Sequence, residues 1–339
     1  MKRWLITGGC GFIGIALIRR LLHESGYLIR IVDNLSVGSR ENLKEVTKFT
    51  EPSQAGPDNW SGVQLFPGDI LDEKLALQTV QGADAVVHLA ANTGVPVSVE
   101  FPREDMQTNI VGTFNYLEAA RAASCTKFIF ASSGATVGEC VPPVNEELPS
   151  RPVSPYGASK LGGEGYCSAY YHSYGLQTVA LRFGNVYGPG SSHKSSVVAA
   201  FLRRAREKLP LIIYGDGAQT RDFIYIHDII SAILAAAHAP DIGGQIFQIA
   251  TNREHTVLEL TNMLVEILDR DGFGPIGVIH EKTRPGEVTR NFSDTSKAAH
   301  ILGWRPQYEL RSGLENTVAW FKTWCLAMDS KTSSNGKDT

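Results

Sequence analysis

The 339-residue sequence predicts an α/β protein with a doubly wound parallel sheet of about seven strands and a smaller C-terminal α/β lobe. Three observations support this prediction. Short apolar runs rich in Val, Ile, Leu and Phe alternate with longer segments of helical apolar spacing, as in a sheet buried on both faces. A glycine-rich turn directly follows the first apolar run. Beyond about residue 183 the alternation loosens and Gly and Pro become more frequent, which indicates a second lobe.

Seven apolar runs are expected to be strands, because each is short and shows little alternation of polar and apolar residues. In chain order they are Arg3–Thr7, Leu28–Asp33, Val63–Phe66, Asp84–Leu89, Lys127–Ala131, Thr178–Arg182 and Gln245–Ile249. Segments with a helical period lie between them, at Phe12–His23, Lys74–Val80, Met106–Ala123 and Leu161–Tyr174. This order of strand and helix predicts a sheet with helices on both faces.

The length suggests two folding units, at roughly 150 residues for each domain. We expect residues 1–182, joined by about 223–250, to form the sheet domain. Residues 183–222 and 251–328 are expected to form the substrate-binding lobe. Residues 329–339 are polar and are expected to be a disordered tail.

Composition excludes several classes of protein. With 43% hydrophobic and 20% charged residues, most of the chain cannot be disordered, and a net charge of −3 gives no basic field for nucleic acid or an anionic membrane. No run approaches the roughly 20 apolar residues of a membrane span. The five cysteines form no CxxC pair, which argues against a zinc site or a disulfide framework. Without a recognisable secretory signal, we expect a cytoplasmic protein that binds no metal.

Gly8, Gly11 and Gly14 form a GxxGxxG pattern between the first expected strand and the first expected helix. Such glycines permit a tight turn, close approach of the backbone to a pyrophosphate, and close packing of helix on strand. The helix N-terminus adds N–H groups and the positive end of its dipole. A glycine-rich turn without a ligand is the alternative, but the flanking strand and helix favour a dinucleotide-binding Rossmann domain.

Asp33 ends the second expected strand, 19 residues after Gly14. A carboxylate at this point accepts hydrogen bonds from the adenosine ribose hydroxyls and repels a 2′-phosphate. NAD is therefore favoured over NADP as the cofactor, although a surface aspartate that caps a turn is the alternative. Asp69 follows the third strand, where its side chain could meet the adenine amino group.

Tyr156 and Lys160 form a YxxxK pair that follows a helix-entry signal, Ser154-Pro155. A spacing of four residues places both side chains on one helical face, where the ammonium is expected to lower the pKa of the tyrosine and make it a general base. Ser133 lies at the end of the fifth strand, where it could hydrogen-bond the oxygen being oxidised. A solvated Tyr/Lys pair and a serine-rich loop are the alternatives.

With these motifs the sequence resembles the extended short-chain dehydrogenase/reductase family over about residues 1–325. Within that family it is most similar to the nucleotide-sugar epimerases and dehydratases, and above all to the UDP-hexose 4-epimerases. The resemblance rests on TGGCGFIG (7–14), DNLSVG (33–38), GDI (68–70), HLAA (88–91), NIVGT (109–113), SPYGASK (154–160), RFGNVYGP (182–189), GDGAQTRDFIYIHD (215–228), RPGE (284–287) and LGWRP (302–306).

The resemblance implies the residues of the site. The catalytic set is Ser133, Tyr156 and Lys160. The NAD pocket is expected to include Gly8, Gly11, Phe12, Ile13, Gly14, Asp33, Asn34, Ser36, Gly38, Asp69, Ile70, Leu89, Ala90, Ala91, Asn109, Tyr156 and Lys160. The expected substrate contacts are Thr93, Ser133, Asn185, Arg221, Arg284, Glu287 and Asn291.

Several of these residues have implied roles. Arg221 and Arg284 resemble the residues that contact the nucleotide diphosphate, and Asn185 resembles the residue that holds the sugar or the first phosphate. Asn291 matches the position that gates the sugar 2-substituent, and its small side chain is expected to admit an N-acetyl group. Val137 stands where the family usually has a tyrosine, so a cofactor contact from that ring is not expected.

The residues after Ser133 decide between reactions. Dehydratases and sugar-acid decarboxylases of the family carry acids there, whereas this sequence has Gly134 and Ala135. We therefore expect an NAD-dependent isomerase of carbohydrate metabolism or polysaccharide biosynthesis, a nucleotide-sugar 4-epimerase for UDP-glucose/galactose or UDP-N-acetylhexosamines. The alternatives are a 4-ketoreductase, a dehydratase, a uronic-acid epimerase or a non-enzymatic dinucleotide-sensing relative. The helices expected at 106–123 and 161–174 lie where the family forms a homodimer.

Overall fold

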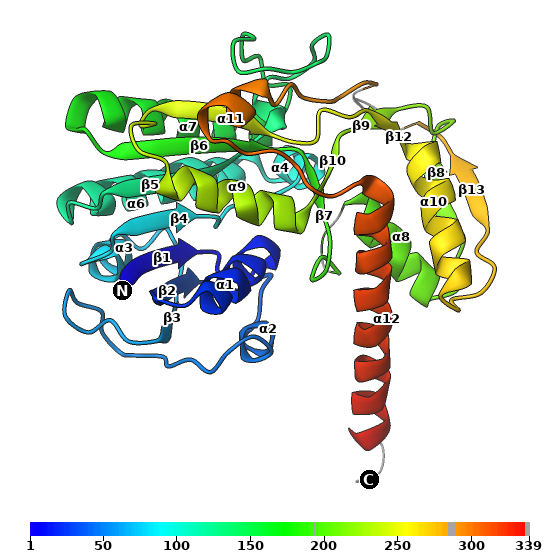
Figure 1. The fold of residues 1–339 in the computed structure, drawn as a ribbon, viewed down its shortest axis with the longest axis horizontal. Coiled ribbons are helices and arrows are strands. Elements are labelled where there is room, and N and C mark those ends of the chain that lie inside the picture. The colour runs from blue at the N-terminus through cyan, green and yellow to red at the C-terminus, as the bar shows by residue number, and fades with distance from the viewer. Residues whose placement is uncertain (193, 195, 284–288, 336–339) are drawn as a thin grey trace.

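The computed structural model describes residues 1–192, 194, 196–283 and 289–335. Its centre is a seven-stranded parallel sheet in the order β11-β6-β5-β4-β1-β2-β3 (Figure 1). The strands are β1 (Lys2–Thr7), β2 (Tyr27–Asp33), β3 (Val63–Pro67), β4 (Ala85–His88), β5 (Lys127–Ser133), β6 (Gln177–Phe183) and β11 (Gln245–Ile249). All seven strands predicted from the sequence are confirmed. The order reverses at β1, which pairs with both β2 and β4, so the carboxyl ends of β1 and β4 border the crevice where such sheets bind ligands.

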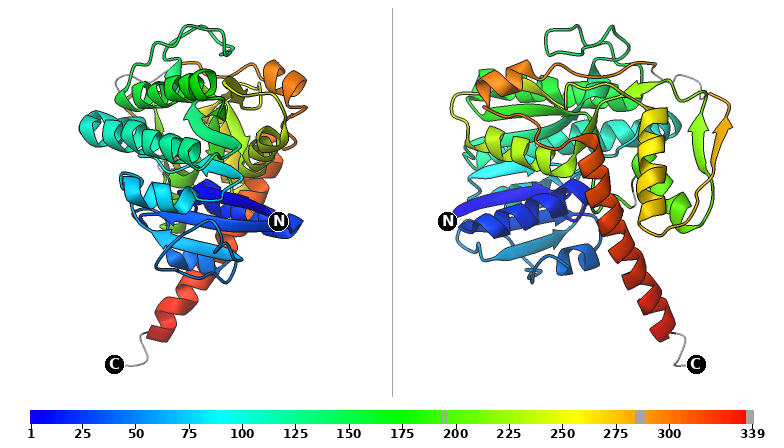
Figure 2. Two further views of the ribbon diagram at one scale, coloured as in Figure 1. Left: turned by 90° about the vertical axis from the view of Figure 1, so that its left-hand side faces the viewer. Right: turned by 45° about the vertical axis from the view of Figure 1, so that its right-hand side comes forward.

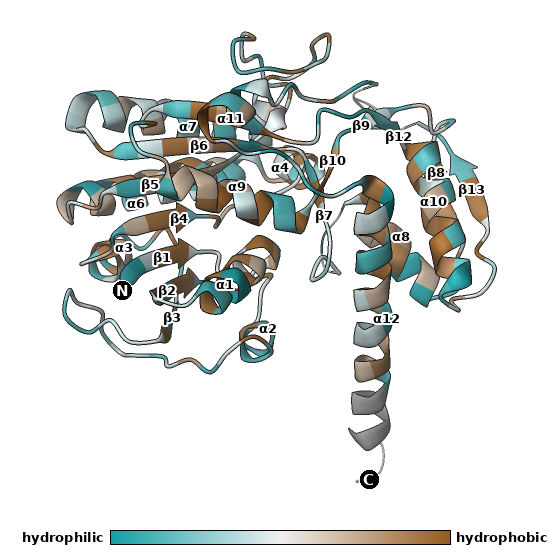
Figure 3. Ribbon diagram, viewed as in Figure 1, coloured by the Kyte–Doolittle hydropathy of each residue, from teal (hydrophilic) through white to brown (hydrophobic). Residues whose placement is uncertain are grey.

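Successive strand residues point to opposite faces, and each face has its own apolar core. Leu5 and Phe128 belong to one core, and their neighbours Ile6 and Ile129 belong to the other. The first core is covered by α3 (Glu73–Val80), α6 (Gly112–Ala122) and α7 (Pro155–Tyr174). The second is covered by α1 (Phe12–Glu24) and α9 (Ile226–His238). Figures 1 and 2 show helices on both sides of the sheet, and Figure 3 shows its central strands as mainly hydrophobic. This burial on both faces explains why the strands are nearly continuous apolar runs.

Two of the expected helices differ from their predictions. The segment expected at 106–123 consists of α5 (Pro102–Met106), a π-helical turn η1 (Gln107–Val111) and α6. Helix α7 begins at Pro155 rather than Leu161, because the Ser154 hydroxyl accepts a hydrogen bond from the Gly157 N–H and proline suits the first helical position. Tyr156 and Lys160 therefore lie in the first turns of α7, as the entry signal indicated.

Outside the central sheet, the described residues of the expected second lobe form three short strand pairs and three longer helices, and one of these strands, β10, comes from the segment expected to join the sheet domain. The strands pair as β7 (Asn185–Tyr187) with β10 (Phe223–Tyr225), β8 (Leu211–Tyr214) with β13 (Val278–Glu281), and β9 (Thr220–Arg221) with β12 (His255–Thr256). The helices are α8 (Val197–Arg206), α10 (Val257–Arg270) and α12 (Leu310–Asn335). Leu264 of α10 and Phe321 of α12 belong to the same apolar core as α1 and α9. The two units thus share one continuous core.

The remaining helices are α2 (Arg40–Lys44), α4 (Val95–Glu100), the 3-10 turn η2 (Gly134–Thr136) and α11 (Ser296–Ile301). Helix α11 lies against β11, with the Lys297 ammonium over the Phe247 ring, so this part of the expected lobe returns to the sheet. Helix α12 continues to Asn335 (Figure 1). Residues 336–339 lie outside the described residues, and the disordered tail expected at 329–339 stays a prediction. Polar residues can extend a helix once it has formed, since only nucleation is costly. Within the described residues, no helix is both long and apolar enough to span a membrane.

Candidate active site

A cavity of about 420 Å³ opens at the carboxyl ends of the sheet strands. It lies beside β1 and β4, at the reversal of strand order, and extends to the ends of β5 and β6. The sequence-predicted residues that line it are Gly8, Gly11, Phe12, Ile13, Gly14, Asp33, Asn34, Ser36, Gly38, Asp69, Ile70, Leu89, Ala90, Ala91, Thr93, Ser133, Tyr156, Lys160 and Asn185. Residues from more than half of the chain thus meet at one edge of the sheet.

The glycine turn packs so closely against its neighbours that side chains would not fit at two of its positions. Gly8 has φ +67°, and a Cβ on it would lie 2.8 Å from the Ala90 nitrogen. A Cβ on Gly14 would lie 2.5 Å from the Gly8 oxygen. Gly11 precedes α1 and has no side chain to accept hydrogen bonds from the first N–H groups of that helix, and the first residues of the helix line the cavity. This arrangement fits a dinucleotide pyrophosphate, which accepts such N–H groups.

Asp33 is fixed at the end of β2 by backbone hydrogen bonds. Its two carboxylate oxygens accept from the N–H groups of Cys10, at 2.9 Å, and Leu35, at 2.8 Å. Burial raises the pKa of Asp33, and these two hydrogen bonds oppose the rise. Within the described residues, no lysine or arginine forms an ion pair with it. A buried carboxylate without a cation fits ribose hydroxyls and disfavours an added phosphate.

The catalytic residues predicted from the sequence come together, but the electrostatics differ from the prediction. Lys160 donates a hydrogen bond from Nζ to the Ala131 carbonyl at 2.8 Å, and burial lowers its pKa to about 8. The pKa of Tyr156 is raised rather than lowered, because burial outweighs its hydrogen bond to Ser133. The prediction that Lys160 lowers the pKa of Tyr156 is therefore wrong for the protein alone. The nearby carboxylate of Asp105 raises the pKa of both groups.

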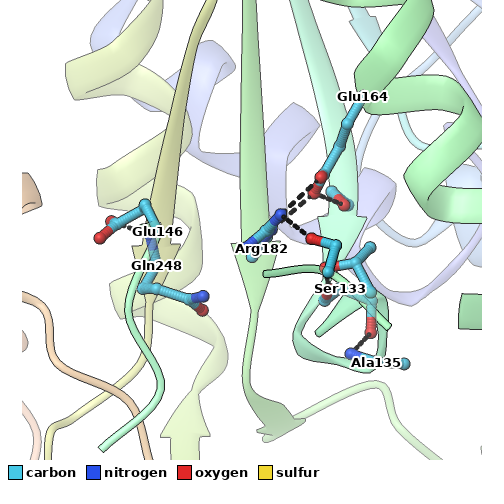
Figure 4. Close-up of polar contacts among 9 residues, drawn as sticks. Ser133, Ala135, Glu146, Glu164, Arg182 and Gln248 are labelled. Carbon is cyan, nitrogen blue, oxygen red and sulfur yellow. Dashed lines mark hydrogen bonds and ion pairs between the residues drawn. The ribbon is translucent and has the colours of Figure 1, made fainter. Parts of the chain in front are cut away.

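Behind Lys160 lies a buried ion pair that sequence reasoning missed. Arg182 of β6 binds both oxygens of Glu164 on α7, at 2.8 and 2.7 Å, and the Ser132 hydroxyl donates to Glu164 at 2.5 Å (Figure 4). Each charged side chain is only 2% exposed. Glu164 also raises the pKa of Lys160. The spacing of four residues between Lys160 and Glu164 could have indicated this pair in the sequence, because it places both side chains on the same face of α7.

Next to Arg182, on the edge strand β11, lies a further buried polar side chain, Gln248. Gln248 of β11 pairs in register with Arg182, and Figure 4 shows its amide extending between the two strands. Within the described residues, neither polar atom of that amide has a hydrogen-bond partner. The backbone N–H of Gln248 donates to Glu146 at 2.7 Å. Glu146 thus satisfies a donor that the edge strand would otherwise leave unpaired.

Asn109 does not line the cavity, contrary to the expectation for it. It is buried in the π-helical turn η1, where its Oδ1 accepts from the Asn92 N–H at 2.8 Å and its Nδ2 donates to the Asn92 carbonyl at 3.0 Å. Nδ2 also lies 3.0 Å from Ser159 on α7. Asn109 therefore holds in place a neighbour, Asn92, that does line the cavity. Nothing in the sequence indicated this π turn, because helical periodicity alone does not reveal one.

A second cavity of about 370 Å³ adjoins the first and shares Asn185, Val186 and Ser196 with it. Arg221 and residues of β8 and α8 line it. Asn291 lines neither cavity; its backbone N–H lies 3.4 Å from the Thr220 hydroxyl, beside Arg221. Arg284 and Glu287 lie outside the described residues. Of the expected substrate contacts, the structure thus brings Thr93, Ser133, Asn185 and Arg221 to the two joined cavities.

Comparison with known proteins agrees with this arrangement. Residues 4–250 match the model of the NAD-dependent epimerase/dehydratase family. A putative UDP-glucose 4-epimerase of Methanocaldococcus jannaschii is 37% identical over 322 residues, which are 94% of this chain and 98% of that protein. A dTDP-glucose 4,6-dehydratase of Neisseria meningitidis is 32% identical, with 96% of this chain and 95% of that protein covered.

Solved structures show the same fold. The UDP-glucose 4-epimerase of Thermotoga maritima, solved with UDP-glucose, superposes with a TM-score of 0.84 at 34% identity and covers 95% of this chain and 99% of its own. The UDP-glucuronic acid 4-epimerase of Bacillus cereus, solved with UDP-glucuronic acid and NAD, has a TM-score of 0.82 at 31% identity and the same coverage.

Proposed function

The chain belongs to the NAD-dependent epimerase/dehydratase family, with NAD as its cofactor, and we propose that it is a nucleotide-sugar 4-epimerase acting on UDP-linked sugars. In the proposed reaction the sugar is oxidised transiently at C4 and then reduced from the opposite face. The net chemistry is an isomerisation, and no cofactor is consumed.

One observation carries the choice of epimerisation over dehydration. Elimination of water requires an acid that protonates the departing hydroxyl, and the backbone directly after Ser133 offers none. Gly134 has no side chain, and the Ala135 N–H donates to the Ser133 hydroxyl at 3.2 Å. Among the described residues that line the two cavities, the carboxylates are Asp33 and Asp69, which follow β2 and β3 rather than β5. The described part of the site can therefore support exchange of a proton and a hydride, and it offers no acid for elimination next to Ser133.

The residues of this chain have distinct proposed roles. NAD, when bound, supplies the hydride acceptor and donor and, in its oxidised form, a positive charge. Asp33 and the glycine turn would hold it. Tyr156 accepts the proton of the sugar 4-hydroxyl as the C4–H bond breaks and the carbonyl forms, and it returns that proton when the C–H bond forms again. Ser133 hydrogen-bonds the reacting oxygen, while Lys160 supports the phenolate.

The joined cavities support the turn of the sugar that such a reaction needs. Arg221 in the second cavity would hold the diphosphate, with which its planar guanidinium can form paired hydrogen bonds. Asn185 lines both cavities and lies between that position and the reacting centre. The nucleotide could thus stay bound while the 4-keto sugar presents its other face to the cofactor.

The test uses UDP-glucose that carries deuterium at C4, incubated with the NAD-loaded enzyme. We expect UDP-galactose that retains the deuterium at C4, without release of reduced cofactor. A panel of UDP-N-acetylglucosamine, UDP-glucuronate and dTDP-glucose then defines the substrate. A 4-keto-6-deoxy sugar as the product, or loss of the deuterium to reduced cofactor in solution, would overturn the proposal.

We also propose a homodimer formed through α6 and α7. Met106, Val111, Phe114, Tyr166 and Tyr174 are large apolar or aromatic side chains exposed along this side of the protein. Phe114 and Tyr166 pack edge to face, with ring centroids 5.4 Å apart, so the two helices present one joint surface. Light scattering at micromolar concentration should give twice the chain mass. Phe114→Glu should give the monomer mass, and a monomeric parent protein would contradict the proposal.

A further inference from the structure

A lysine from the loop between β7 and α8 enters the place where the two cavities join. Lys194 lines the first cavity, and its Nζ lies 3.3 Å from the carbonyl oxygen of Val186, a residue that lines both. The ammonium also lies 5.0 Å from the ring centroid of Phe12, at the start of α1. Lys194 therefore lies between the cofactor turn and the expected substrate lobe.

The backbone N–H and carbonyl groups of Lys194 both form hydrogen bonds. The Lys194 N–H donates to the Ser191 carbonyl at 2.9 Å. Arg203 of α8 donates to the carbonyl oxygens of Ser192 and Lys194, at 2.6 Å each. These bonds join the backbone of Lys194 to Ser191 and to α8, and the side chain of Lys194 lines the cavity.

The protein supplies no negative partner for this ammonium among the residues that the structure describes. No aspartate or glutamate there forms an ion pair with Lys194, and burial alone lowers its pKa, to about 8. Lys160 has a similar pKa, but the carboxylates of Asp105 and Glu164 act on it. A partly enclosed ammonium with one long hydrogen bond to a carbonyl is costly, since most of its three donors lack a strong acceptor. A bound anion would remove that cost.

We propose that Lys194 binds an anionic group of the substrate at the junction of the two cavities. This inference rests on the proposed function, because a nucleotide sugar is what would bring such an anion there. Two groups could supply the oxyanion: the diphosphate, which all these substrates carry, and the carboxylate of a uronic acid sugar. Both accept hydrogen bonds from an ammonium, and binding would restore the full charge of Lys194.

The test measures dissociation constants by calorimetry for UDP, UDP-glucose and UDP-glucuronate. All measurements use NAD-loaded protein with Tyr156→Phe, so that turnover does not interfere. Lys194→Met removes the charge at nearly constant length, and Lys194→Arg keeps it. Lys74→Met changes the net charge equally at an exposed position on α3 and serves as the matched control.

We expect Lys194→Met to weaken binding about tenfold or more, as for loss of a charge-assisted hydrogen bond. Lys194→Arg should keep most of the affinity, and Lys74→Met should change nothing. Equal weakening for all three ligands identifies the diphosphate, and weakening for UDP-glucuronate alone identifies the carboxylate. Unchanged affinity for every ligand in Lys194→Met would overturn the inference. Because binding is measured without turnover, this test does not depend on the deuterium assay. The role of Lys194 can therefore be confirmed or contradicted even if the protein forms no C4 epimer.

Discussion

The two sides of the site differ in how their charged groups are neutralised. On the α7 side, Glu164 and Arg182 form a buried pair, and Lys160 donates to a carbonyl with two carboxylates close enough to affect its pKa. On the side of the β7–α8 loop, Lys194 has no such carboxylate among the described residues. The difference shows that the protein neutralises its own charges around the proposed base, whereas on the loop side our proposal leaves the charge of Lys194 to be neutralised by a ligand.

Removal of the proposed base should have the largest effect. Tyr156→Phe deletes the hydroxyl that accepts the proton, and general acid–base catalysis contributes about 10²–10⁴-fold. We expect kcat to fall by at least that factor, measured as the rate of C4 epimer formation. Thermal unfolding and NAD binding should stay near those of the parent, since the described hydrogen bond of this hydroxyl is with Ser133. An active Tyr156→Phe variant would place the base elsewhere.

Breaking the buried pair should mainly lower stability. Glu164→Gln leaves the Arg182 guanidinium without an anionic partner, and such a loss typically costs about 3–5 kcal/mol of unfolding free energy. Urea denaturation measures it. The double variant Glu164→Leu with Arg182→Met is the control, and it should recover much of the loss because no unpaired charge remains. A Glu164→Gln protein as stable as the parent would show that the pair is not structurally important.

The same change should move the pH profile of the reaction. Glu164 raises the pKa of Lys160, which is about 8, so Glu164→Gln should lower that pKa further. Lys160 would then lose its proton at a lower pH, and the alkaline limb of kcat/KM should shift toward lower pH. An unshifted alkaline limb would mean that the charge of Lys160 does not control it.

The choice between NAD and NADP tests the part of the first cavity that contains Asp33. Asp33→Ser removes the carboxylate that we expect to bind the ribose hydroxyls, so NAD should bind roughly tenfold more weakly, while NADP gains relative to NAD. Fluorescence titration with both cofactors measures the ratio. Asp33→Asn keeps the size and the acceptor and serves as the control for lost charge. Equal affinities of the parent protein for NAD and NADP would contradict this role of Asp33.

The smallest effect is expected in the second lobe, at Asn291. If this residue gates the sugar 2-substituent, Asn291→Tyr should lower kcat/KM for UDP-N-acetylglucosamine relative to UDP-glucose by about tenfold, through steric exclusion. Asn291→Ala is the matched control and should keep both substrates. The structure places the backbone N–H of Asn291 at 3.4 Å from the hydroxyl of Thr220, the residue before Arg221, and Asn291 lines neither described cavity. If Asn291→Tyr leaves the ratio of the two kcat/KM values unchanged, or if the parent protein rejects UDP-N-acetylglucosamine, Asn291 does not gate the sugar 2-substituent.

Local pattern was sufficient for the framework of the protein. The seven strands, the glycine turn and the placement of Tyr156 and Lys160 on one helical face all follow from residues that are close together in sequence. Apolar runs predict strands that are buried on both faces of the sheet. The glycine spacing predicts the tight turn between a strand and the helix that follows it. The main errors of this kind concerned helix ends, such as the π turn before α6 and the start of α7 at Pro155.

Only the tertiary structure decided the electrostatics of the site. The pKa of Tyr156 rises because segments distant in sequence bury it, and Asn109 holds Asn92 because η1 packs against α7. Lys194 shows no sequence signal at all, since its importance depends on Val186 and Phe12 lying next to it. Periodicity reports which residues share a face within a few positions along the chain. Burial and charge depend on the whole fold, because desolvation and Coulomb interactions act through space and not along the sequence.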